Sequence, residues 1–291
     1  MSKYKLPESI PCDMGGIGDD LDDRLDGVVR MLSCAPMDDL HSFLDIGFGQ
    51  GQLTKWLCRR GKQVTATGLE LESYGCDVEL FMSQYNVRIE ECSVEKMPFA
   101  DKSFDAVIMS HLLEHCPNVQ LALQEARRVL SDTGYLFLFV PPHTDRVLAG
   151  HISVGWNIGQ LMYVLLLNGF DVKHGMFAQV GYNVAAFVKK NLTPLPPLRG
   201  DRGDIAILNQ HDLFPMPIFT SDGYNDSFEG NVTSINWPAF ELTVSKSGPK
   251  QIAKRALILM IKLMPANMRT KLSNMIERIL KLFDQASARI C

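Results

Sequence analysis

Glycines spaced two residues apart after an acidic residue are the stretch of this sequence that most directly suggests chemistry. Asp45 is followed by Gly47, Gly49 and Gly51, and such glycines let the backbone bend sharply while a ligand lies against it. The dinucleotide pattern Gly-x-Gly-x-x-Gly fails, because its third glycine is absent. Glu70 follows at the spacing, roughly 20 residues, at which a carboxylate binds the hydroxyls of a ribose. The bend and the carboxylate together predict a nucleoside site.

Histidines form the second group of residues that could do chemistry. Four of the seven histidines lie near the expected site, namely His111, His115, His143 and His151. An imidazole gains and loses a proton near neutral pH, so it suits a general base. We expect His143, just after a predicted strand, to be the catalytic base, with His151 as the second candidate. The alternative for each is an ordinary hydrogen-bonded loop histidine.

The sequence predicts no metal site. Its seven cysteines are scattered and none forms a Cys-x-x-Cys pair, which is typical of a reducing compartment and offers no zinc ligands. Asp145 could orient His143, or cap the helix that follows. As metal ligands, these two residues are too few to make a site.

Alternating strands and helices are expected to position these residues. The apolar run 43–46 predicts a buried parallel strand, and 52–60 has apolar residues at helical spacing, so the glycine bend joins a strand to a helix. The further strands predicted are 63–69, 87–91, 104–110, 135–140, one beginning at 169, and 183–189. The further helices predicted are 19–32, 72–84, 117–130 and 158–167. This alternation predicts an α/β fold.

These motifs, in this order and spacing, resemble those of the class I S-adenosylmethionine-dependent methyltransferases, over roughly residues 40 to 190. The matching stretches are 45–51, 68–70, 93–99, 104–108, 111–115 and 130–135. The Met97-Pro98-Phe99 turn is similar to that of the small-molecule branch of the family. The resemblance implies a doubly wound, mostly parallel, seven-stranded sheet closed by an antiparallel hairpin. The alternative is a generic nucleotide-binding α/β domain with another ligand.

The resemblance implies S-adenosylmethionine as the cofactor. The residues that would contact it are Asp45, Gly47, Phe48, Gly49, Gly51, Glu70, Leu71, Ser93, Val94 and His111. Ser93 departs from the family, which usually has an acidic residue there to accept a hydrogen bond from the adenine amino group. The backbone of Val94 is expected to carry more of that contact. His115 is common in the family and mostly structural, whereas His111 is expected beside the cofactor.

Four segments are expected along the chain. Residues 1–40 form a lead-in and a helix over the cofactor, and 41–190 form the methyltransferase domain. Residues 191–249 are rich in proline and aromatic residues, which predicts either an irregular flap packed on the core or a lid over the acceptor site. Residues 250–291 form a basic helical tail, the C-terminal extension of the fold.

The tail differs in charge from the rest of the chain. It has nine basic and two acidic residues, a charge of +7, so the remainder carries −11 of the total −4. The negative total argues against nucleic acid as a partner. The tail is expected either to lie on an anionic membrane or to dock on the protein, including on a second subunit of a homo-oligomer. No apolar signal region begins the chain and no apolar run could span a bilayer, so we expect a cytoplasmic protein, with the tail able to reach the inner face of the membrane.

Three functions are weighed. The first is O-methylation of a sugar or glycan intermediate by in-line transfer, because 150–161 is similar to methyltransferases associated with surface-polysaccharide assembly. The second is methylation of a lipid-like small molecule such as a quinone precursor. The third is a catalytically silent scaffold, against which the intact glycine bend and Glu70 argue.

Overall fold

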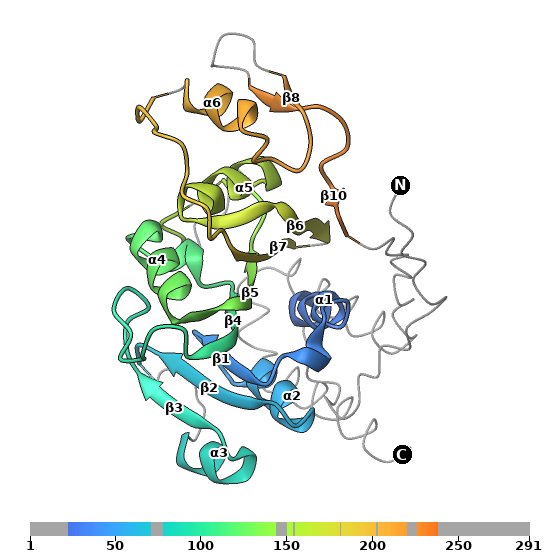
Figure 1. Cartoon of the computed structure of the whole chain (residues 1–291). Coiled ribbons are helices and arrows are strands. Elements are labelled where there is room, and N and C mark those ends of the chain that lie inside the picture. The colour runs from blue at the N-terminus through green and yellow to red at the C-terminus, as the bar shows by residue number, and fades with distance from the viewer. Residues whose placement is uncertain are drawn as a thin grey trace, which may run out of the picture. The chain divides into compact units, whose positions relative to one another are not determined.

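The computed structural model describes residues 23–70, 78–143, 150–153, 155–180, 182–201, 203–219 and 226–237 (Figure 1). The chain divides into two compact units, Met1–Pro238 and Ala239–Cys291. The second unit, with the expected helical tail, lies outside the described residues, as does most of the lead-in segment.

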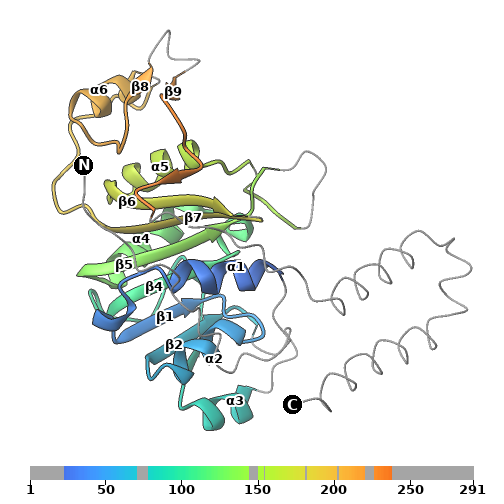
Figure 2. The same ribbon diagram turned by 90° about the vertical axis from the view of Figure 1, so that its right-hand side faces the viewer.

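An eight-stranded sheet forms the centre of the first unit (Figures 1 and 2). Its order is β10-β6-β7-β5-β4-β1-β2-β3. The strands are β1 Ser42–Ile46, β2 Gln63–Gly68, β3 Arg88–Glu91, β4 Phe104–Ser110, β5 Leu130–Val140, β6 Phe170–Val180, β7 Asn183–Lys190 and β10 Ser234–Ile235. Strands β1 to β5 pair in parallel, whereas β7 is antiparallel to both β5 and β6. The expected α/β, doubly wound, mostly parallel sheet with a closing hairpin is confirmed.

Helices cover both faces of the sheet. They are α1 Asp23–Leu32, α2 Gln52–Arg59, α3 Val78–Tyr85, α4 Val119–Val129, α5 Ile158–Leu167 and α6 Asp204–Gln210, with the 3-10 turns η1 Met37–Asp39 and η3 Leu113–His115. Helices α1 and α2 lie on one side of the sheet, and α4 and α5 on the other (Figure 1). Helix α2 buries the apolar residues that predicted it, Leu53, Trp56 and Leu57. Helix α3 fully buries none of its side chains.

Two strands differ from the sequence-based prediction. Strand β5 begins at Leu130, five residues early, whereas β6, for which no end was predicted, runs to Val180. The sheet also has an eighth strand where seven were expected, because β10 pairs antiparallel with β6. A second small sheet, β8 Ile218–Phe219 with β9 Ser227–Phe228, forms in the same proline-rich stretch.

Side chains directly after β10 anchor it. The Nδ2 group of Asn236 donates to the Gly175 carbonyl at 2.9 Å, and Asn236 has a positive φ of 52°. The ring of Trp237 is 8% exposed and its centroid lies 4.6 Å from that of Phe187 in β7. The chain therefore returns from the proline-rich stretch to pack on the main sheet.

No helix among the described residues is long and apolar enough to cross a bilayer.

Candidate active site

The glycine bend lies where the strand order of the sheet reverses. Strand β1 is flanked by β2 on one side and β4 on the other, and open α/β sheets bind ligands in the crevice at that position. Gly47, Gly49 and Gly51 have positive φ angles of 74°, 55° and 77°, a region that glycine enters without steric cost. The amides of Gly47 and Phe48 donate to the Thr67 carbonyl at 2.8 and 3.1 Å, which fixes the bend to the end of β2.

The three glycines face different surroundings. A Cβ atom at Gly51 would lie 2.6 Å from the Phe81 ring of α3, and one at Gly47 would lie 3.0 Å from Leu112. A Cβ atom at Gly49 would have no atom within 4 Å. A side chain at Gly51 or Gly47 would displace Phe81 or Leu112, whereas Gly49 leaves open space against the backbone.

The carboxyl group of Asp45 is buried beneath the bend. It is 2% exposed, and its Oδ2 accepts a hydrogen bond from the Thr54 hydroxyl of α2 at 2.6 Å. Burial raises the pKa of Asp45 to about 6, against the opposing effect of the Thr54 hydrogen bond. Asp45 therefore joins the end of β1 to helix α2, and its predicted contact with a cofactor stays a prediction.

Glu70 is exposed two residues after the end of β2. Because β1 and β2 are adjacent and parallel, Glu70 and the glycine bend lie at the same edge of the sheet. That position suits a carboxylate that binds a ribose held over the bend. Leu71, predicted beside the adenine, lies outside the described residues.

Ser93 and Val94 follow β3, in a segment whose later residues are hydrogen-bonded to helix α4. Ser93 Oγ accepts a hydrogen bond from the Glu95 amide at 3.2 Å, and Val94 packs against the core. The Arg128 guanidinium donates to the carbonyls of Met97 and Phe99 at 3.0 and 2.7 Å. These hydrogen bonds hold the Met-Pro-Phe turn that follows Val94, and the adenine contacts of Ser93 and Val94 stay predictions.

His111 directly follows β4 beside the bend, but its ring faces the protein. Nε2 lies 2.8 Å from Asn183 Oδ1, Nδ1 lies 3.3 Å from Glu114 Oε1, and the side chain is 6% exposed. The ring stacks on Tyr182 at 5.8 Å between centroids. Its φ of 53° is left-handed, a strained conformation that concentrates at functional sites. A contact with the cofactor stays a prediction, and both ring nitrogens already have protein partners.

The two candidate bases lie in different surroundings. His143 is exposed beyond the carboxyl end of β5, and its amide donates to the Trp156 carbonyl at 3.1 Å. His151 is half-buried and packs edge-on against His115, with ring centroids 5.1 Å apart. Asp145, the expected orienting partner of His143, lies outside the described residues.

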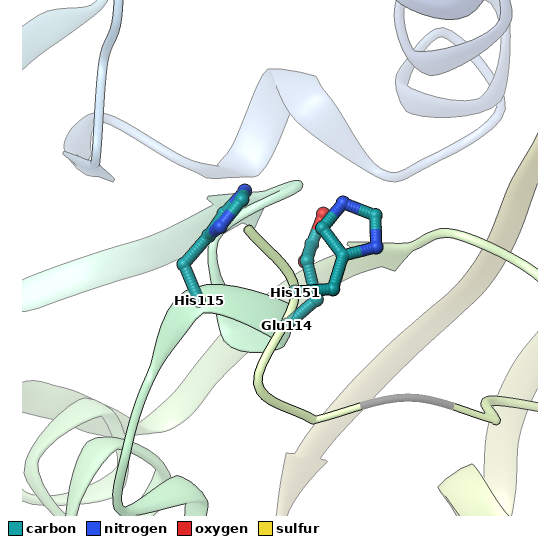
Figure 3. A group of neighbouring side chains, drawn as sticks. All are labelled: Glu114, His115 and His151. Carbon is teal, nitrogen blue, oxygen red and sulfur yellow. The ribbon is translucent and has the colours of Figure 1, made fainter. Parts of the chain in front are cut away.

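Sequence reasoning did not bring His115 and His151 together. In the structure these two rings and the Glu114 carboxyl group converge, with one ligand atom from each within 4.8 Å of the others (Figure 3). The sequence had suggested only His143 and Asp145 as metal ligands. The adjacency of Glu114 and His115 was visible in the sequence, but their approach to His151 depends on how the loop after β5 returns.

Comparison with known proteins agrees with this geometry. Residues 44–138 match the family model described as a methyltransferase domain. A demethylmenaquinone methyltransferase of Porphyromonas gingivalis is 30% identical over 129 residues, which are 42% of this chain and 50% of that protein. A fatty-acid O-methyltransferase of Mycolicibacterium smegmatis is 31% identical over 36% of this chain and 41% of its own length. The chain thus spans about half the length of these relatives.

Solved structures also align with the chain. The PH0226 protein of Pyrococcus horikoshii is 17% identical and covers 59% of this chain and 93% of its own, with a TM-score of 0.49.

Proposed function

We propose that this chain, whose residues 44–138 form a class I S-adenosylmethionine-dependent methyltransferase domain, methylates a small-molecule acceptor. The observation that carries the proposal is the glycine bend at the strand-order reversal, with open space at Gly49 and Glu70 at the same edge. A positively charged sulfonium cofactor supplies an activated methyl group, so the protein has mainly to position the reactants.

The sheet order sets the direction in which the reactants lie. Glu70 follows β2, the glycine bend follows β1, His111 follows β4 and His143 follows β5. Neighbouring strands are about 4.8 Å apart, so the end of β2, where Glu70 lies, and the end of β5, where His143 lies, are roughly 15 Å apart along one edge of the sheet. A nucleoside bound by Glu70 and the bend would therefore direct its reactive end toward β4, with the acceptor beyond it near β5.

His143 is proposed as the general base for an oxygen acceptor. Its exposed imidazole accepts the proton that the acceptor hydroxyl loses as the oxygen becomes methylated. A base in this role must reach the acceptor, and His143 is exposed beyond β5 whereas His151 is half-buried. His151 remains the second candidate.

The proposed acceptor is a hydroxyl of a sugar or glycan intermediate, on the resemblance of 150–161. A lipid-like acceptor is the second candidate, because the relatives include a demethylmenaquinone and a fatty-acid methyltransferase. The proposed flap contributes a cavity of about 540 Å³ with apolar side chains such as Ile205, Phe214 and Phe228. That lining would favour a lipid-like portion of the acceptor.

Calorimetry with S-adenosylhomocysteine tests the cofactor site. Gly49→Val places a side chain in the open space above the bend, so we expect it to abolish binding. Gly61→Val is the matched control, since Gly61 also has a positive φ, 72°, and no atom near its would-be Cβ, but lies beyond α2. The Gly61→Val chain carries similar backbone strain and should bind S-adenosylhomocysteine as tightly as the unaltered chain does. Failure of the unaltered chain to bind would leave only the scaffold function.

Transfer of a labelled methyl group identifies the acceptor. Sugar nucleotides, lipid-linked glycans, quinone precursors and fatty acids would each be offered with labelled S-adenosylmethionine. On the accepted compound, His143→Ala should lower kcat by about 100-fold, the lower range for loss of a general base, while S-adenosylhomocysteine affinity stays unchanged. An unchanged kcat would transfer the role to His151 or remove the need for a base.

A further inference from the structure

A buried carboxylate and two imidazoles converge beside the end of β4. Glu114 and His115 belong to the 3-10 turn η3, and His151 comes from the segment that returns after β5. Figure 3 shows the Glu114 side chain between the two histidine rings. One potential ligand atom from each residue lies within 4.8 Å of the other two. This combination of two nitrogens and one oxygen is a donor set that binds zinc and related divalent ions.

One oxygen of the Glu114 carboxyl group is buried without a hydrogen-bond donor among the described residues. Glu114 is 1% exposed, and its Oε2 atom has no hydrogen-bond partner among the described residues. Its other oxygen, Oε1, lies 3.3 Å from His111 Nδ1. A buried carboxylate oxygen without a donor is costly. A cation bound at Oε2 would remove that cost.

Hydrogen bonds prepare His115 as a ligand. Its Nδ1 lies 3.2 Å from the Gly150 carbonyl oxygen, which can only accept, so Nδ1 carries the proton. In neutral imidazole the lone pair is then on Nε2. A metal-binding histidine commonly donates its second nitrogen to a backbone carbonyl in this way.

The backbone holds His151 against η3. The amides of Ile152 and Ser153 both donate to the Glu114 carbonyl, at 2.7 and 3.0 Å. Oε1 of Glu114 lies 3.3 Å from Nδ1 of His111, whose Nε2 lies 2.8 Å from Asn183 Oδ1. The three prospective ligands therefore come from one short turn and one segment that is hydrogen-bonded to it.

From this arrangement we propose that Glu114, His115 and His151 bind a divalent transition-metal ion of the zinc class. Around a tetrahedral zinc with bonds of ~2.05 Å, ligand atoms lie about 3.3 Å apart. The 4.8 Å limit of the group requires an approach of up to about 1.5 Å, which rotation of the exposed His115 ring can supply. Three protein ligands leave a fourth position for water or for an oxygen of an acceptor.

Titration of the full chain with Zn²⁺ tests the site. The chain is first stripped with a chelator, and its cysteines are alkylated so that thiolates do not compete. We expect one ion per chain by calorimetry. His115→Ala and His151→Ala should each weaken binding by at least ~100-fold, the upper range for loss of an outer-shell partner. His174→Ala is the matched control, because this exposed histidine pairs with Asp171 instead; it should bind as the unaltered chain does.

Two further measurements keep the test decisive. Glu114→Gln, checked for folding by circular dichroism, should also lose the visible absorption that bound Co²⁺ gives in the unaltered chain. Absence of stoichiometric binding, or equal binding by the His115→Ala and His151→Ala chains, would overturn the proposal. S-adenosylhomocysteine binding measured on the same samples reports on the methyltransferase proposal separately, since the metal site does not depend on it.

Discussion

Asp45 illustrates at the scale of one residue how the site and the stability of the fold are linked. Burial raises the pKa of its carboxyl group from 3.8 to about 6, so the folded state binds the proton more tightly than the unfolded chain does. The stabilisation from that proton is complete below about pH 4 and is lost as the pH rises through about 6. A shift of this size corresponds to about 3 kcal/mol.

Asp45→Asn should remove this pH dependence. The Asn side chain can still accept the Thr54 hydrogen bond at its oxygen but does not titrate. The free energy of unfolding of the unaltered chain should fall, relative to that of Asp45→Asn, by about 2 kcal/mol between pH 4 and pH 7. Urea unfolding of both proteins at several pH values measures the difference. A difference that stays constant with pH would show that Asp45 is not held in a desolvated position.

At the scale of the elements, strong periodic patterns predicted the fold and short or irregular ones did not. The strand, bend and helix around Asp45 lie within one or two residues of the prediction. Strand β5 begins early because 131–134, which separate the predicted helix from the predicted strand, join the strand across a register shift opposite Phe104 and Ala106. Strand β10 has two residues, too few for any periodicity, so only its packing on β6 and Phe187 defines it.

The same reasoning explains what was missed in the site. The glycine bend and the strand-end histidines could be placed from sequence, because a parallel sheet brings its carboxyl ends to one edge. His115 and His151 are far apart in sequence, and their contact depends on the hydrogen bonds from 152 and 153 to Glu114. The inward rotation of the His111 ring depends on Asn183 of β7, which carries no signal in the sequence.

Trp237→Ala tests whether β10 is a stable part of the sheet. Trp237 is 8% exposed, so its removal should cost about 3–5 kcal/mol in the free energy of unfolding. Phe219→Ala is the control, because that ring is 55% exposed and its loss should cost less than about 1 kcal/mol. Urea unfolding measures both. Equal costs would mean that the eighth strand adds little to the fold.

At the scale of the whole molecule, charge is distributed unevenly. Residues 250–291 carry +7 and the remainder −11. A basic segment gains roughly 1 kcal/mol for each Lys or Arg close to an anionic membrane surface. Two roles are proposed for the tail, membrane contact and docking on a second copy. Binding would depend on salt and lipid composition in a different way in each role.

Removal of residues 250–291 should abolish sedimentation of the chain with anionic vesicles. Neutral vesicles should bind little of either form, and added salt should weaken binding of the full chain because it screens the attraction. The truncated chain should keep its affinity for S-adenosylhomocysteine. The outcome is different if the full chain does not bind anionic vesicles and the truncation instead changes the number of chains per particle in solution. The tail then mediates self-association.

Two walls that differ in packing flank the proposed nucleoside site at the glycine bend. One wall is the sheet edge, buried and hydrogen-bonded. The other includes Phe81, which contacts Gly51 from a helix that fully buries none of its side chains. Such weakly packed elements open at small free-energy cost. Binding at the proposed site would then use part of its free energy to order this helix, so stiffening α3 would tighten binding without altering a single ligand contact.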